Sequence, residues 1–257
     1  MVDDWCRIIG GILISGFLFI ISNNFTPKIS EKMNALIKTT EPSNKINPDD
    51  AAVTHTAYAW SEDGKDRFTT TKPNLNLFDG ARDFSGDWWG RNGSQTDGTY
   101  KGLTVMKRTA QWVGMAKTFT APKDGTYTFS AYVKSSGNNA DIIRWININD
   151  VQDVEKAPNK SLGNNFDWLR DTFTVTLKAK ETISASYNIS GSSSDSIIWT
   201  AGHKWEDGST ATPYMPSASE VKPSDQPKYI GTYTDKSKTD SQDPNKYTWK
   251  LNPDYHE

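Results

Sequence analysis

Residues 73–218 consist of short segments in which apolar and polar side chains alternate, and this pattern constrains the fold more than any other feature. The segment 126–133 places Tyr127 and Phe129 on one side and Thr128 on the other, as a β-strand does. Gly, Asn and Asp turns separate such segments about every 8–12 residues, a spacing typical of a β-sandwich or barrel. Because no segment in this region has a helical period, we predict an all-β domain and not a βαβ fold.

The last predicted strand of this region, 196–204, carries several large side chains at alternate positions. Trp199, Ala201, His203 and Trp205 fall on one side of it, and we expect that side to face the core. His203 is therefore expected to be a structural histidine and not a ligand.

The aromatic content is unusual: aromatic residues make up 12% of the chain, including 10 tryptophans. One or two small β cores need only some of these rings, so we expect a few to be exposed for binding. The formal net charge is −2, and Lys and Arg are scattered, which argues against a nucleic-acid-binding face. The single cysteine, Cys6, excludes an internal disulfide framework and a Cys-based zinc site.

The N-terminal region differs from the rest in composition. Residues 8–21 are uncharged and strongly apolar, but they are fewer than the roughly 20 residues that a full membrane span needs. We predict an apolar helix over residues 1–24 and leave three interpretations open: a membrane anchor, a buried or subunit-contact helix, and a remnant of a rearranged gene. Residues 25–50 are polar and are interpreted as a linker.

Two stretches at opposite ends of the remaining chain look like halves of one module. They are AYAWSEDGKDRF at 57–68 and YIGTYTD at 229–235, the latter followed by aromatic and acidic residues. Together they resemble a small module of tail-tip and baseplate proteins from phages of Gram-positive bacteria, in which the two halves run nearly into each other. Insertions are best tolerated at exposed turns. We therefore predict a connector module made of 51–68 plus 225–253, with a domain at 72–220 inserted into it.

The ends of the inserted region carry a second resemblance. The opening NLNLFDGARDFSG at 74–86 and the closing KWEDGSTATPY at 204–214 are similar to the ends of jelly-roll carbohydrate-binding modules found in phage tails. The resemblance covers residues 73–220 and implies a jelly-roll β-sandwich. It also implies a structural calcium ion, for which Asn76, Asp79 and Asp83 would supply oxygen ligands. The alternative is that these side chains cap turns, and no other cofactor is expected.

Candidate sugar-binding residues are aromatic side chains with polar neighbours. Sugars stack their C–H faces on aromatic rings, and their hydroxyls need directional partners such as Asn, Asp, Gln and Arg. The strongest candidate is the run containing Trp88, Trp89 and Arg91, where one ring can face inward and the other outward; we favour Trp89 as the outward one.

Two further segments contribute candidates. Trp112 precedes a strand and is either a binding residue or part of the core. In the segment Arg144, Trp145, Ile146, Asn147, alternation puts Trp145 and Asn147 on one face together with Asn149, which predicts a sugar-binding row. The alternative is that Trp145 belongs to the core and the Asn side chains lie at the strand end.

Catalysis is not expected. A glycosidase needs two carboxylates about 5–10 Å apart in a cleft, and pairs such as Asp167 with Asp171 have simpler explanations as loop or turn residues. No GxSxG motif, Walker loop or Cys–His nucleophile pattern is present.

The sequence therefore predicts a non-catalytic phage or prophage tail or baseplate component that binds host cell-surface polysaccharide. Its expected partners are that polysaccharide and other tail proteins, without nucleic acid; membrane contact would run through residues 8–21. The expected location is the virion tail or baseplate. The alternatives are a membrane-anchored protein of a Gram-positive lysogen that masks surface sugars, a structural tail connector without sugar binding, and a decayed prophage fragment.

Overall fold

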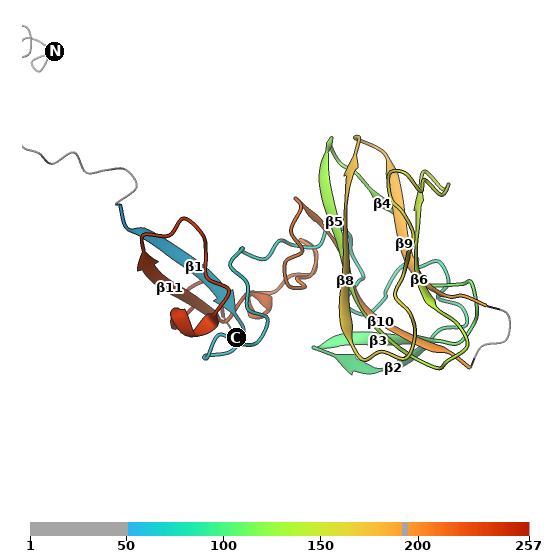
Figure 1. Ribbon diagram of the computed structural model, residues 1–257, viewed down its shortest axis with the longest axis horizontal. Coiled ribbons are helices and arrows are strands. Elements are labelled where there is room, and N and C mark those ends of the chain that lie inside the picture. Colours follow the sequence, from blue (N-terminus) through green and yellow to red (C-terminus); the bar gives the residue numbers. More distant parts are fainter. Residues whose placement is uncertain (1–50, 192–194, 257) are drawn as a thin grey trace, which may run out of the picture. The chain divides into compact units, whose positions relative to one another are not determined.

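The computed structural model describes residues 51–191 and 195–256, and this part of the chain is built from antiparallel strands (Figure 1). The all-β prediction is confirmed. The predicted apolar helix at 1–24 and the linker at 25–50 lie outside the described residues. Within the described residues, no helix is long and apolar enough to cross a membrane.

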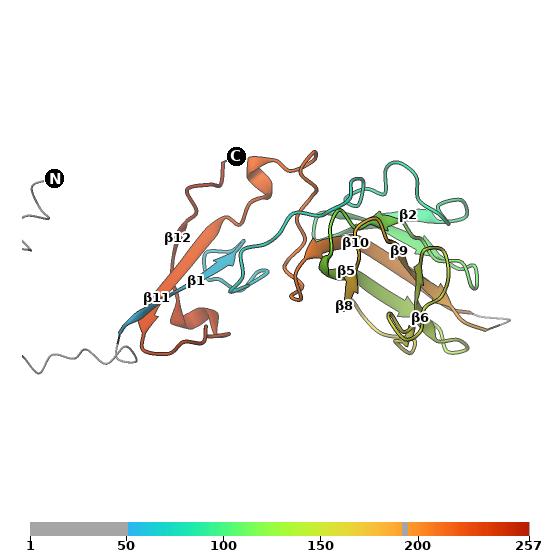
Figure 2. The same cartoon turned by 90° about the horizontal axis from the view of Figure 1, so that it is seen from above.

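The larger part of the structure is a β-sandwich of two stacked sheets (Figures 1 and 2). The five-stranded sheet has the order β2-β3-β10-β5-β8, from strands β2 (Gln95–Tyr100), β3 (Leu103–Arg108), β10 (Ile197–Asp207), β5 (Gly125–Ser136) and β8 (Leu169–Leu177). The four-stranded sheet has the order β4-β9-β6-β7, from strands β4 (Phe119–Thr120), β9 (Thr182–Ile189), β6 (Ile142–Ile148) and β7 (Lys160–Ser161). This arrangement is a jelly-roll β-sandwich, as predicted.

The core lies between the two sheets and follows the predicted alternation. On β5 the side chains of Tyr127, Phe129, Ala131 and Val133 are all buried. Trp205 on β10 stacks on Phe119 of β4, with ring centroids 5.2 Å apart, and so joins the two sheets. Burial of this continuous apolar surface is the main favourable term that holds the sheets together.

A bulge in β10 corrects the prediction for that strand. The register of β10 against β5 shifts between Ala201 and Lys204, where one extra residue is inserted. Trp205 therefore pairs with Phe129 on the core side, whereas Trp199 pairs with Lys134 on the opposite side of the sheet. Trp199 is half-buried there and donates a hydrogen bond of 2.6 Å from Nε1 to Asp97. The expectation that Trp199 faces the core with Trp205 is wrong, because simple alternation assumes an unbroken strand.

The two distant stretches at the ends of the described chain form a third sheet. Strand β1 (Val53–Ala59) pairs along its whole length with β11 (Tyr229–Asp235), and β11 pairs with β12 (Thr248–Leu251). His55 of β1 links the elements of this sheet by hydrogen bonds of 3.0 Å to Asp235 and 2.7 Å to Asp240. Two short 3-10 helices, η2 (Pro223–Asp225) and η3 (Pro244–Lys246), flank β11 in the chain. All the strands of the sandwich thus lie in sequence between β1 and β11.

Candidate functional site

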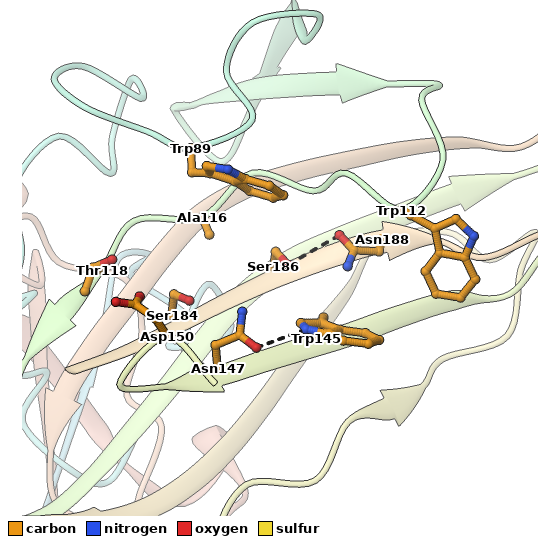
Figure 3. Close-up of a pocket in the computed structure, with 10 residues that line it drawn as sticks. All are labelled: Trp89, Trp112, Ala116, Thr118, Trp145, Asn147, Asp150, Ser184, Ser186 and Asn188. Atoms are coloured by element: carbon orange, nitrogen blue, oxygen red, sulfur yellow. Dashed lines mark hydrogen bonds between the residues drawn. The ribbon is translucent and has the colours of Figure 1, made fainter. Parts of the chain in front are cut away.

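An open pocket of about 480 Å³ lies on the face of the four-stranded sheet that points away from the core (Figure 3). This volume falls within the range of about 300–1,000 Å³ that is usual for small-ligand sites. Its lining residues are Trp89, Trp112, Ala116, Thr118, Trp145, Asn147, Asp150, Ser184, Ser186 and Asn188.

The floor of the pocket is a grid of alternate side chains from β6 and β9. Trp145 lies opposite Ser186 and Asn147 lies opposite Ser184 in the antiparallel register. The indole Nε1 of Trp145 donates a hydrogen bond of 3.2 Å to Oδ1 of Asn147. That contact uses the amide oxygen. Within the described part of the chain the amide nitrogen has no partner and can donate toward a bound molecule, and Figure 3 shows it turned into the pocket.

The wall of the pocket is formed by Trp89, a residue that is 61% exposed. Its neighbour Trp88 is buried and packs edge-on against Phe84, with ring centroids 4.8 Å apart. The expectation that Trp89 faces outward and Trp88 inward is confirmed. The backbone of Trp89 is fixed to Ala116 by two hydrogen bonds of 2.8 and 3.1 Å. The exposed ring therefore projects from a backbone that is held by an isolated antiparallel bridge to Ala116.

Trp112 closes one end of the pocket with its backbone in an unfavourable conformation. Its φ angle is +53°, in the left-handed region that a bulky residue rarely adopts and that costs about 1–2 kcal/mol. A hydrogen bond of 2.9 Å from its amide to the carbonyl of Ile189 holds it there. The residue is 52% exposed, and its ring meets that of Trp145 edge to face, at 6.4 Å between centroids. The alternative that Trp112 belongs to the core is thereby excluded.

Arg108 holds the loop that carries Trp89, although it does not line the pocket. Its Nη1 donates to the carbonyl oxygen of Gly90 and, at 2.8 Å, to the hydroxyl of Ser94. The side chain is buried, and desolvation lowers its pKa below the usual value. Burying a cation whose partners are only carbonyl and hydroxyl oxygens costs free energy. This cost indicates that the loop conformation, which positions Trp89, is important.

We expect the substitution Arg108→Met to loosen this loop. Hydrogen bonds from a charged donor contribute about 1.5–3 kcal/mol each, so amide hydrogen exchange at Trp89 and Ala116 should become at least about tenfold faster. Exchange measured by mass spectrometry provides its own control, because the amides of β9 should keep their protection. Unchanged exchange at Trp89 would mean that the loop is held without Arg108.

Two other predicted site residues are absent from the pocket lining. Arg91 donates from Nη1 to the carbonyl oxygen of Phe84, which ties its own loop together. Arg144 points into the core, where its Nη1 lies 2.9 and 3.0 Å from the two carboxylate oxygens of Asp171. Arg144 alternates with Trp145 on β6 and so must face the other way. Along with the buried Trp88, these two arginines do not reach the pocket.

The predicted calcium ligands make other contacts. Oδ1 of Asn76 accepts a backbone hydrogen bond of 3.0 Å from Trp205, and its amide nitrogen donates to the carbonyl of His203 at 2.9 Å. Asp83 accepts from the amide of Ser85 at 2.9 Å, as a turn-capping residue does, and Asp79 accepts from the hydroxyl of Ser219 at 2.6 Å. In the described ranges, no group of three or more His, Cys, Asp or Glu could hold a metal ion. Calcium binding by Asn76, Asp79 and Asp83 stays a prediction.

Several lining residues have no counterpart in the sequence prediction. The hydroxyls of Ser184 and Ser186 and the amide of Asn188 alternate with buried Ala185 and Tyr187 on β9, so the period-2 pattern of this segment could have revealed them. Asp150 follows β6 in a turn, and its position in the pocket depends on the tertiary structure.

The fold and the pocket together define a jelly-roll β-sandwich with an open, tryptophan-lined pocket on one sheet face. No protein-family model matches the chain, and no curated protein matches it. Among solved structures, the chain is similar to the tripod of the bacteriophage Tuc2009 baseplate, with 28% sequence identity, a TM-score of 0.52, and coverage of 79% of both chains. This is a likeness to a phage tail protein over most of the described residues.

More distant likenesses were also found. One is a family 61 carbohydrate-binding module in complex with β-1,4-galactotriose, with 8% identity, a TM-score of 0.40, and coverage of 52% of this chain and 100% of that one. Another is a xylan-binding domain from Paenibacillus barcinonensis, with 13% identity, a TM-score of 0.36, and coverage of 55% and 99%.

Proposed function

We propose that this protein is a non-catalytic component of a phage or prophage tail or baseplate that binds a polysaccharide on the surface of a Gram-positive host. The observation that carries the proposal is the pocket with three tryptophans and two asparagine side chains on one sheet face. The rings of Trp89, Trp112 and Trp145 offer apolar surfaces for the C–H faces of sugars. The amide groups of Asn147 and Asn188 offer donors for sugar oxygens.

The composition of the pocket supports binding without hydrolysis. A glycosidase places two carboxyl groups about 5–9.5 Å apart around the scissile bond. Among the described residues that line this pocket, Asp150 is the only one with a carboxyl group. Ser184 and Ser186 have no histidine beside them in the lining, so an activated hydroxyl nucleophile has no support either.

The place of the protein in the virion rests on the tripod likeness. At 28% identity over 79% of each chain, the likeness supports a role in the tail or baseplate, with other tail proteins as partners. The sheet formed by β1, β11 and β12 would be the connector to those partners. A tail presents several copies of such a module, so weak binding at each pocket adds up to firm attachment.

The proposal predicts that Trp89→Ala and Trp145→Ala each strongly weaken binding to host cell walls while the fold is kept. Stacking on an aromatic ring contributes about 1–3 kcal/mol, a loss of about five- to 150-fold in affinity per ring. The measurement is a pull-down of the full chain on purified cell walls of candidate hosts, with released sugar assayed alongside.

The matched control is Trp199→Ala, which removes a half-buried tryptophan from the outer side of the other sheet. It should leave wall binding unchanged. Retained binding in both pocket variants, or their failure to fold by circular dichroism, would remove the support for this site. Release of sugar by the unaltered protein would contradict the non-catalytic assignment.

A further inference from the structure

Asp150 places a free carboxylate at the end of the pocket opposite Trp112 (Figure 3). The residue is exposed, and within 51–191 and 195–256 its side chain has no hydrogen-bond or ion-pair partner. Other acidic residues nearby in sequence are engaged: Asp141 accepts from Ser161 at 2.8 Å, and Asp153 accepts from the amide of Lys156 at 3.0 Å. A carboxylate without a partner beside a binding pocket is available to a ligand.

The backbone at Asp150 is unfavourable for an aspartate. Asn149 and Asp150 have φ angles of +48° and +64°, and Ile148 and Val151 on either side exchange two backbone hydrogen bonds of 2.7 and 3.0 Å. These are the features of a type I′ turn, in which the second central position strongly prefers glycine. Asn149 fits the first position, and its Oδ1 accepts from the amide of Thr182 at 3.0 Å. Asp150 thus occupies a glycine position at a conformational cost that the turn itself does not require.

The electrostatic character of the pocket follows from this residue. None of the described lining residues is Lys, Arg or His, so Asp150 supplies the only formal charge of the lining. The rings of Trp89 and Trp145 line the same pocket and carry no charge that would offset it. A carboxylate accepts hydrogen bonds from sugar hydroxyls, but it repels another carboxylate or a phosphate.

We propose that Asp150 is the specificity-determining residue of this pocket: it selects uncharged polysaccharide and rejects polysaccharide that carries carboxylate or phosphate groups. The inference rests on the proposed function, and it adds to it the chemical class of the ligand. In the bound state a sugar hydroxyl donates to the Asp150 carboxylate while the rings of Trp89, Trp112 and Trp145 cover the apolar faces of the sugars.

The test uses wall polysaccharide from a host whose walls the protein binds, separated by anion exchange into an uncharged and an acidic fraction. The full-length protein should bind the uncharged fraction at least about tenfold more tightly than the acidic one at low salt, and the ratio should shrink as salt screens the charge. In Asp150→Asn and Asp150→Gly the ratio should fall toward one. Asp150→Gly creates an Asn-Gly type I′ turn, so its thermal midpoint should be unchanged or higher, which separates recognition from folding.

The control variant is Glu155→Gln, which removes one negative charge from an exposed position in the same loop but outside the pocket lining. Its discrimination between the two fractions should equal that of the unaltered protein. Equal or tighter binding of the acidic fraction, or full discrimination in Asp150→Gly, would overturn this inference and leave the proposed function standing. Failure to bind the intact walls of any candidate host, before fractionation, would instead overturn the proposed function itself.

Discussion

Asp171→Ala is expected to lower the free energy of unfolding by about 3–5 kcal/mol, a large part of the roughly 5–15 kcal/mol by which folded proteins are usually stable. Asp171 on β8 and Arg144 on β6 belong to different sheets, and their side chains are 2% and 6% exposed. The carboxylate also accepts a hydrogen bond of 3.1 Å from the hydroxyl of Tyr187. Removing it leaves the Arg144 cation buried between the sheets without its counter-charge, and that desolvated charge is the source of the loss.

Denaturant unfolding monitored by tryptophan fluorescence gives the size of this effect. The double variant Asp171→Leu with Arg144→Met should recover most of the stability, because an apolar pair of similar volume carries no buried charge. Lys123→Ala is the comparison for an exposed ion pair: Lys123 and Asp207 lie 3.4 Å apart with side chains 66% and 50% exposed, and we expect a change below about 1 kcal/mol. A loss of that small size in Asp171→Ala would mean that water reaches the Arg144 guanidinium.

Acid destabilisation through His203 is the second large effect that we expect. Complete burial lowers the pKa of His203 from 6.5 to about 3. Its ring is surrounded by Phe84, Trp88 and Phe129 at centroid distances of 5.4 to 5.6 Å, and neither ring nitrogen has a hydrogen-bond partner in the described structure. Protonation inside this aromatic cluster would leave a cation with no polar partner.

The sign of the pH dependence follows from the two pKa values. Between pH 6.5 and about 3 the unfolded chain binds a proton at His203 and the folded chain does not. This group therefore contributes stability that is present above pH 6.5 and is lost on acidification, by about 1.4 kcal/mol per pH unit. In His203→Leu this contribution to the slope should disappear. The readout is the difference in unfolding free energy between variant and unaltered protein at pH 7, 5.5 and 4.

His256→Leu serves as the control because His256 is exposed near the chain end. It should leave the pH profile of stability as it is. If His203→Leu and the unaltered protein lost stability in parallel between pH 6.5 and 4, then His203 would be accessible to protons in the folded state, contrary to its burial.

The pocket was predicted from the sequence only in part, and strand alternation explains which part. The period-2 pattern identifies Trp145 and Asn147 as neighbours on one face of β6, and both line the pocket. The same pattern places Arg144 on the other face, and its partner Asp171 is 27 residues further along, on a different sheet. A pairing between sheets leaves no local signature in the sequence. The prediction that Arg144, next to Trp145, is a site residue is wrong for this reason.

The residue types along the chain also do not determine the type of a turn or the position of a bulge in a strand. The adjacent Asn149 and Asp150 are ordinary turn residues by composition, and only the closure of Ile148 against Val151 shows that Asp150 stands where glycine is favoured. The bulge between Ala201 and Lys204 is similarly absent from the pattern of β10, yet it decides that Trp199 and Trp205 lie on opposite faces.

The amino-acid sequence by itself determined the all-β class, the jelly-roll resemblance, and the abundance of aromatic side chains suited to sugars, because these depend on side-chain periodicity and residue type along the chain. Only the tertiary structure decided which rings are exposed and what they meet. Trp89, Trp112 and Trp145 come from three separate segments, and Asp150 comes from the turn that follows β6. Their meeting on one face depends on the packing of the sheets and on contacts between residues far apart in the chain, which no local pattern records.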